Sequence, residues 1–154
     1  MIVLNETQGS ENVKSTKELL HILESAKSLN ELEKFTNELS SMNSFSSFHE
    51  YINSYIAKKN IIPAELIQAS LIQRNYGYQI LNGTKHPGKD KIIALCLSLK
   101  LTVEEAQRAL SLANECQLYA KKRRDSIIIF ALNNQLSVIE TNELLHDMNE
   151  NTLL

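Results

Sequence analysis

The sequence predicts an all-α protein, and three observations lead to that prediction. Five positions carry a hydroxyl residue followed three residues later by glutamate, the capping-box pattern that marks helix starts. They are Ser15/Glu18, Ser28/Glu31, Ser47/Glu50, Thr102/Glu105 and Ser137/Glu140. After these starts the apolar residues recur at helical spacing. The apolar, β-branched run 126–130 fits a buried strand as well as a helix, but the chain offers no second strand to pair with it, which favours helix.

The capping boxes divide the first third of the chain into three helices. The first carries Leu19, Leu20, Ile22, Leu23 and Ala26, and the second carries Leu32, Phe35 and Leu39. The third begins after Ser47 and has its apolar residues between Phe48 and Ile56. Each stripe recurs every three or four residues, the spacing of one helix face.

The middle of the chain predicts two short helices in close succession. Pro63 fits a first helical position, where its missing N–H costs nothing. A second helix runs from about Gln73 to Leu81 and stops at Asn82-Gly83, residues that tolerate positive φ. Two such helices a few residues apart fit a helix-turn-helix.

The remaining helices are strongly apolar. They are expected over about 90–99, from Thr102 to about 113, from a cap at Asp125, and over 137–148. We therefore expect an N-terminal helical pair (1–46), a central helix-turn-helix domain (47–116) and a C-terminal helical extension (117–154), with the serine-rich segment 40–47 as the hinge.

Composition limits the classes of protein that fit. A length of 154 residues with 43% hydrophobic content suits one compact unit or two small lobes. The net charge of -2 excludes coating of nucleic acid by bulk positive charge, so DNA contact requires a local patch. The apolar run 1–4 is too short for a signal peptide or a membrane span. Cys96 and Cys116 lie in apolar patterns and are expected to be buried free thiols. A cytoplasmic protein that does not enter a membrane is the resulting expectation.

Residues 47–115 resemble the five-helix DNA-binding domain of the Xre/Cro/C1 repressor family. The helix at Pro63-Ala64-Glu65-Leu66 matches the first helix of the family's motif, and 73–82 matches its recognition helix. Asn82-Gly83-Thr84-Lys85-His86-Pro87 matches the Asn-Gly-x-x-x-Pro connection, and 90–101 matches the fourth helix. The resemblance implies a five-helix repressor-like fold.

Nearly the whole chain is also similar to a group of uncharacterised, Xre-like proteins of Gram-positive bacteria. That similarity rests on the runs 76–80, 87–91, 104–108, 118–119 and 123–125. The chain departs from the usual repressor pattern at Leu81, where glutamate is common, and at Gly77. Glycine inside a helix costs about 1 kcal/mol relative to alanine, so Gly77 predicts that another element packs very close to this helix.

Local residues supply the two kinds of group that DNA recognition needs. Amide and guanidinium side chains near the start of a recognition helix can form paired hydrogen bonds with base edges. The base-contact candidates are Gln73, Arg74, Asn75 and Gln79, together with Tyr78, which is expected to be more exposed than Tyr76. The phosphate-contact candidates on the following loop and helix are Lys85, His86, Lys89 and Lys91.

The densest basic run, Lys121-Lys122-Arg123-Arg124, is a candidate second site for an anion or a partner. Positive charge at a helix N-terminus opposes the helix dipole unless Asp125, an anion or other carboxylates offset it. A solvated linker is the alternative interpretation.

Catalysis has little support in the sequence. The four histidines, His21, His49, His86 and His146, lie on separate elements, and no glycine-rich phosphate loop is present. We expect surface or capping roles for them, no cofactor, no metal site and no enzymatic activity.

Two functional hypotheses remain. The first is a sequence-specific transcriptional regulator that binds double-stranded DNA as a homodimer, since one such domain buries little surface. The helices on either side of the central domain would supply the dimer interface or a platform for an effector. The second is a protein-interaction module that keeps the repressor fold without binding DNA.

Overall fold

The computed structural model describes residues 15–42 and 47–153, without the side chains of 40–42, and every regular element in those ranges is a helix. The predicted all-α class is therefore confirmed. The chain divides between residues 44 and 45 into two compact units. We call them the N-terminal helical pair and the C-terminal unit. The predicted hinge includes 43–46, which lie outside the described residues, as does the apolar run 1–4.

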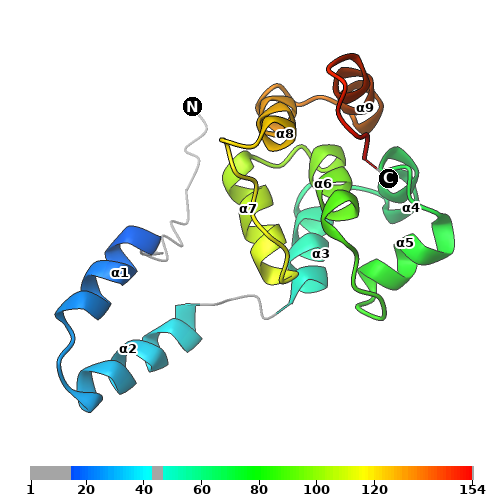
Figure 1. Ribbon diagram of the computed structural model, residues 1–154. Helices are drawn as coiled ribbons and strands as arrows, with labels where there is room; N and C mark the ends of the chain where they lie inside the picture. The colour runs from blue at the N-terminus through cyan, green and yellow to red at the C-terminus, as the bar shows by residue number, and fades with distance from the viewer. Residues whose placement is uncertain (1–14, 43–46, 154) are drawn as a thin grey trace, which may run out of the picture. The chain divides into compact units, whose positions relative to one another are not determined.

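The helical pair consists of α1 and α2, and the C-terminal unit contains α3 to α9 (Figure 1). The bounds are α1 Thr16–Ser25, α2 Leu29–Met42, α3 Phe48–Lys58, α4 Pro63–Ala69, α5 Arg74–Leu81, α6 Lys89–Ser98, α7 Val103–Leu112, α8 Arg123–Asn133 and α9 Val138–Asp147.

Local capping chemistry starts five of these helices where the sequence predicts. Each predicted hydroxyl accepts a hydrogen bond from the backbone N–H of the glutamate three residues later, at 3.1 to 3.4 Å. In the pairs Ser15/Glu18, Ser28/Glu31 and Thr102/Glu105 the carboxylate also accepts from the backbone N–H of the cap residue. Each of these three capping boxes thereby satisfies two N–H groups that have no partner within the helix.

The core of the C-terminal unit surrounds α6. All six residues from Ile92 to Leu97 are buried, as expected for a helix that is apolar on every side. Helix α6 packs against α4, α7, α8 and α9, and it lies in the middle of the unit in Figure 1. The same core includes Ile128 of α8 and Leu145 of α9, so the boundary predicted between residues 116 and 117 falls within this unit.

Two details of the C-terminal half differ from expectation. Asp125, predicted as a helix cap, lies in the first turn of α8, whose N-cap is Lys122. Cys96 is buried as predicted, and burial raises the pKa of its thiol to about 12. The prediction that Cys116 is buried is wrong: it is exposed, because α7 ends at Leu112 and Cys116 lies in the segment that leads to α8.

A polar contact joins α3 to the start of α7. The Tyr51 hydroxyl donates to the backbone oxygen of Glu105 at 3.1 Å, and the Tyr51 and Tyr55 rings meet edge to face, with centroids 5.1 Å apart. Burial raises the pKa of Tyr55. Partial burial acts to raise the pKa of Glu105, but hydrogen bonds from Thr102 and Tyr55 outweigh it and hold that pKa below its usual 4.5.

Candidate nucleic-acid interface

Two short helices, α4 and α5, occupy the segment in which the sequence predicts a helix-turn-helix. Pro63 occupies the first turn of α4, and the Gln73 side chain caps α5 by accepting from the Tyr76 backbone N–H at 2.8 Å. Leu71, in the turn between them, has φ of 57° and is 56% exposed. A bulky residue with positive φ is a strained choice.

Helix α5 presents one polar face to solvent. Arg74, Asn75 and Tyr78 are exposed, and Tyr78 lies three and four positions after the other two, the spacing of residues that share a face of a helix. Gly77, Ile80 and Leu81 are buried on the other side. Of the five predicted base-contact residues, Gln73 is also exposed and Gln79 is half-buried.

The tyrosines of α5 divide as predicted. Tyr78 is 39% exposed, whereas Tyr76 is half-buried and packs against the core. The Arg74 guanidinium lies 5.9 Å from the Tyr78 ring centroid, and this contact restrains both side chains on the exposed face.

Gly77 explains how closely the two helices pack. A Cβ atom at this position would come within 2.5 Å of Cγ2 of Ile67, a buried residue of α4. Only glycine allows this approach. The close neighbour predicted from Gly77 is therefore present.

The far end of α5 is also fixed in place. The Asn53 side chain of α3 donates to the Leu81 backbone oxygen at 2.7 Å. Gly83 has φ of 83°, which ends the helix as the sequence predicts. The backbone N–H of Lys85 then donates to the backbone oxygen of Gln79 at 3.1 Å. These bonds hold the loop 82–87 against α5.

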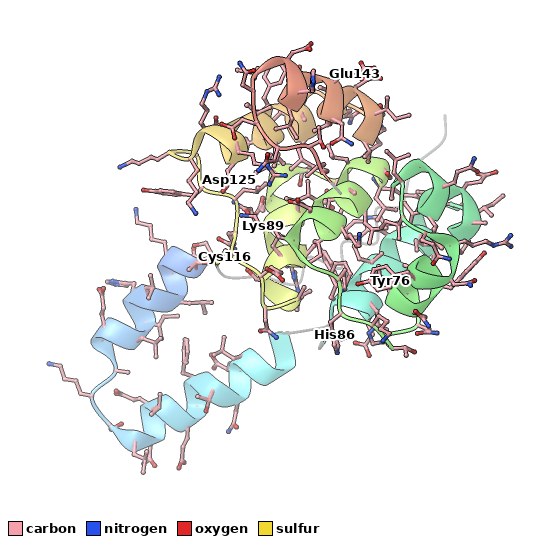
Figure 2. All side chains as sticks on the ribbon, turned by 45° about the vertical axis from the view of Figure 1, so that its right-hand side comes forward. Tyr76, His86, Lys89, Cys116, Asp125 and Glu143 are labelled. Atoms are coloured by element: carbon pink, nitrogen blue, oxygen red, sulfur yellow. The ribbon has the colours of Figure 1, made fainter. Side chains whose placement is uncertain are left out.

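This loop brings cationic side chains beside α5. Lys85 and His86 are exposed, and both line a hollow of about 390 Å³ together with His49, from the first turn of α3. A side chain at position 83 would meet the His49 ring, because a Cβ there would lie 2.7 Å from Cε1. Sequence reasoning did not group His49 with the other two, since 36 or 37 positions of chain separate it from them. Figure 2 shows His86 and Tyr76 at one side of the unit, away from Glu143 of α9.

The other two phosphate-contact candidates have partners within the fold. Lys89 Nζ forms an ion pair with Asp125 at 3.4 Å and is 22% exposed; both are labelled in Figure 2. Lys91 Nζ lies 5.6 Å from the Tyr76 ring centroid, which brings α6 and α5 together. Lys85 and His86 are thus more accessible than Lys89 and Lys91.

The basic run before α8 makes contacts inside the C-terminal unit. Arg124 forms a bidentate pair with Asp90 at 3.0 and 3.1 Å, and it donates to the backbone oxygens of Asn151 and Thr152. Arg123 donates to the Met148 oxygen at 2.7 Å. Lys121 and Lys122 remain exposed. The carboxylates of Asp90 and Glu150 therefore offset the charges of Arg124 and Arg123, one of the alternatives that the sequence left open.

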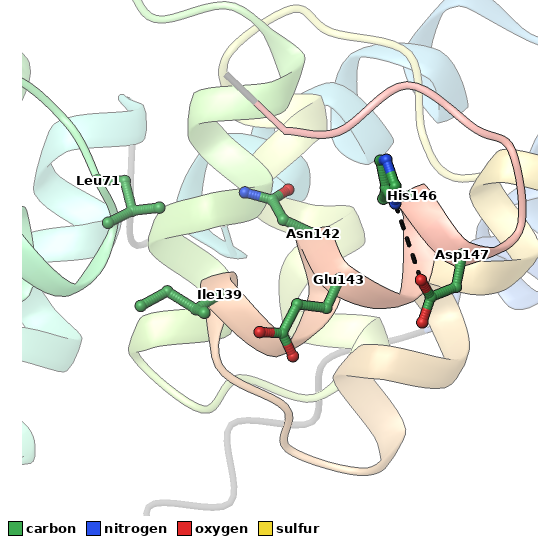
Figure 3. Close-up of a pocket in the computed structure, with 6 residues that line it drawn as sticks. All are labelled: Leu71, Ile139, Asn142, Glu143, His146 and Asp147. Atoms are coloured by element: carbon green, nitrogen blue, oxygen red, sulfur yellow. Dashed lines mark ion pairs between the residues drawn. The ribbon is translucent and has the colours of Figure 1, made fainter.

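A second hollow, of about 560 Å³, lies between α9 and the α4–α5 turn (Figure 3). Leu71 and Ile139 line it, together with the polar residues Asn142, Glu143, His146 and Asp147. His146 and Asp147 approach to 3.7 Å, but both side chains are at least 79% exposed, which makes this a solvated pair. Among the described residues no group of three or more metal-ligating side chains is placed to hold a metal ion.

No described helix is both long and apolar enough to cross a membrane. No protein-family model, curated protein or solved structure matches this chain.

Proposed function

We propose that the C-terminal unit is the sequence-specific DNA-binding domain of a transcriptional regulator of the Xre type, with α5 as its recognition helix. The observation that carries this proposal is the exposed face of α5, where Arg74, Asn75 and Tyr78 stand clear of the core. The helices α3 to α7 then correspond to the five helices of the repressor-like domain.

The side chains of this face suit base edges in the major groove. Arginine pairs with guanine, and asparagine or glutamine pairs with adenine through two hydrogen bonds each. The contact between Arg74 and Tyr78 orders both residues before DNA arrives, which reduces the entropy lost on binding. The close packing at Gly77 supports α5 from behind.

Phosphate contacts fall to the cations beside α5. Lys85, His86 and the first turn of α3 line one hollow, and cations and helix N-termini both attract phosphate. Lys89 and Lys91 add positive charge at the start of α6, although a phosphate that binds Lys89 must compete with Asp125. Such a local patch is compatible with a net charge of -2.

Titration of the full chain with duplex DNA tests the proposal. A binding site is first selected from random duplexes at low salt, and affinity is then measured at several salt concentrations. Arg74→Ala should remove about 1–3 kcal/mol from binding to the selected site. Lys85→Ala should weaken all sequences alike and reduce the salt slope by about one.

Lys58→Ala is the matched control, because this exposed lysine ends α3 at the opposite end from His49. It should leave both affinity and salt slope unchanged. Failure to bind any duplex at low salt would reject the proposal.

The hollow in Figure 3 supports a second candidate, a protein-interaction module that retains this fold without binding DNA. Leu71 and Ile139 are 56% and 57% exposed there. Glu143 and Asp147 lie beside them, so a partner with apolar and basic groups fits best. Absence of DNA binding, together with capture of a partner that Ile139→Glu abolishes, would establish this alternative.

A further inference from the structure

The N-terminal helical pair exposes more apolar surface than we expect of two short helices that are stable without a partner. Helix α1 has no buried residue, and Phe35 is the one buried hydrophobic side chain among the described residues of the pair. Leu20, Leu23, Leu29 and Leu32 are 55%, 41%, 69% and 43% exposed. Isolated helices of about 12–15 residues or fewer are marginal in water, and α1 and α2 have 10 and 14 residues.

The sequence nevertheless specifies both helices strongly. Reciprocal capping boxes start α1 at Ser15 and α2 at Ser28. The apolar residues of α2 follow at intervals of three and four: Leu29, Leu32, Phe35 and Leu39. Such spacing is typical of helices that pack along one seam. The pair is therefore specified as helical while its apolar face remains uncovered within the pair.

The C-terminal unit does not need this face for its own core. Its core cluster consists entirely of residues between Phe48 and Leu153. An apolar face that is not covered within the pair is expected to bind a partner that has a similar apolar face.

Charge at the groove between α1 and α2 indicates what that partner is. Ile22, Ala26 and Phe35 line the groove, which has a volume of about 320 Å³, and Glu31, Lys34 and Glu38 follow its α2 side. A rim with charges of one sign would select a partner with charges of the opposite sign. Because this rim carries both signs, it is complementary to itself, as an interface with twofold symmetry requires.

We propose that the N-terminal helical pair is a homodimerisation module, in which the apolar faces of two copies pack into a four-helix arrangement. At 1.5 Å per residue the helices are roughly 15 and 21 Å long and about 10 Å across. Two such faces lie at the lower end of specific interfaces, where complexes are weak and reversible. The dimer forms and dissociates with concentration and does not require DNA.

Sedimentation of the full chain without DNA, from about 1 to about 100 µM, tests this proposal in the range expected for a small interface. Wild-type protein should move from one chain of 17.5 kDa to twice that mass as concentration rises. The double variant Leu29→Glu, Leu32→Glu should stay at the mass of one chain throughout. Phe130→Glu, with a similarly exposed side chain on α8, should dimerise like wild type.

A second variant addresses the concern that two added carboxylates unfold the helices. Lys34→Glu keeps a good helix former but leaves one sign of charge on the groove rim. It should raise the dissociation constant at least several-fold at low salt, and high salt should reduce the difference.

Three results would overturn the proposal: a wild-type protein of one-chain mass at every concentration, a dimer that survives the double leucine substitution, or a dimer that Phe130→Glu dissociates. None of these measurements involves DNA. Loss of the dimerisation proposal would therefore leave the DNA-binding proposal standing, and the reverse also holds.

Discussion

The two units of this protein use the same local chemistry and reach different degrees of burial. Both start helices with capping boxes, at Ser15 and Ser28 in the helical pair and at Thr102 in the C-terminal unit. In the C-terminal unit those helices surround α6, whose six central residues are all buried. In the pair, four leucines remain exposed. Local signals thus specify helices, whereas only burial makes a stable unit.

A core substitution in each unit gives the largest expected contrast. Ile93 is fully buried in α6, and Leu20 is 55% exposed in α1. Ile93→Ala should lower the free energy of unfolding by about 3 kcal/mol, whereas Leu20→Ala should change it by less than about 0.5 kcal/mol. All five tyrosines lie between Tyr51 and Tyr119 and the chain has no tryptophan, so tyrosine fluorescence in urea reports on the C-terminal unit. Equal losses in the two variants would mean that the units share one folding transition.

The packing of the C-terminal core can be tested where α4 and α5 approach each other at Gly77. Gly77→Ala adds a methyl group 2.5 Å from Cγ2 of Ile67. We expect it to destabilise the C-terminal unit by about 1–2 kcal/mol, because overpacking outweighs the better helix propensity of alanine. A Cβ at Gly88 meets nothing within 4 Å, so Gly88→Ala should cost less, about 0.5 kcal/mol for a poorer cap. A stabilising Gly77→Ala would show that α4 and α5 can separate freely.

The smallest expected change in the free energy of unfolding concerns the capping box, a motif that occurs in both units. Glu105→Gln keeps an acceptor for the Thr102 N–H but removes the charge, and it should cost less than about 1 kcal/mol at pH 7 because the group is partly solvated. The pKa of Glu105 is held below 4.5 in the folded protein, so its contribution is complete above pH 4.5 and is lost as pH falls through the lower, folded value. Wild type and variant should therefore converge in acid.

Glu18→Gln is the matched control, since Glu18 completes the capping box of α1. Urea titrations followed by tyrosine fluorescence from pH 7 to about pH 3 should show no effect of this change on the C-terminal unit. A gap between wild type and Glu105→Gln that widens in acid would contradict the assigned direction of the pKa shift.

Most of the secondary structure could be predicted because its signals are local. Hydroxyl caps act on the N–H groups three residues away, and Gly83 ends α5 through its own φ. Helical periodicity indicated that Tyr76 and Tyr78 face different ways, and the expectation that Tyr78 is the more exposed of the two is confirmed. Each of these features depends on fewer than ten consecutive residues.

What the sequence could not predict depends on contacts between distant segments. The sequence around Arg124 does not indicate that its guanidinium pairs with Asp90, 34 positions earlier. His49 likewise meets Gly83 only after α3 and α5 have packed. Asp125 was expected to cap its own helix, yet it accepts hydrogen bonds from the Tyr119 N–H and Lys89. Such pairings follow from tertiary structure, which no local pattern encodes.

The ion pair between Lys89 and Asp125 has a consequence for control of the proposed regulator. Asp125 holds Lys89 at the start of α6 and also accepts from the Tyr119 N–H at 2.9 Å. A DNA phosphate that displaces Asp125 from Lys89 would remove this contact between α6 and α8. Thermodynamic reciprocity then requires that an effector which breaks this ion pair favours the proposed phosphate contact at Lys89, and that one which strengthens the pair opposes it.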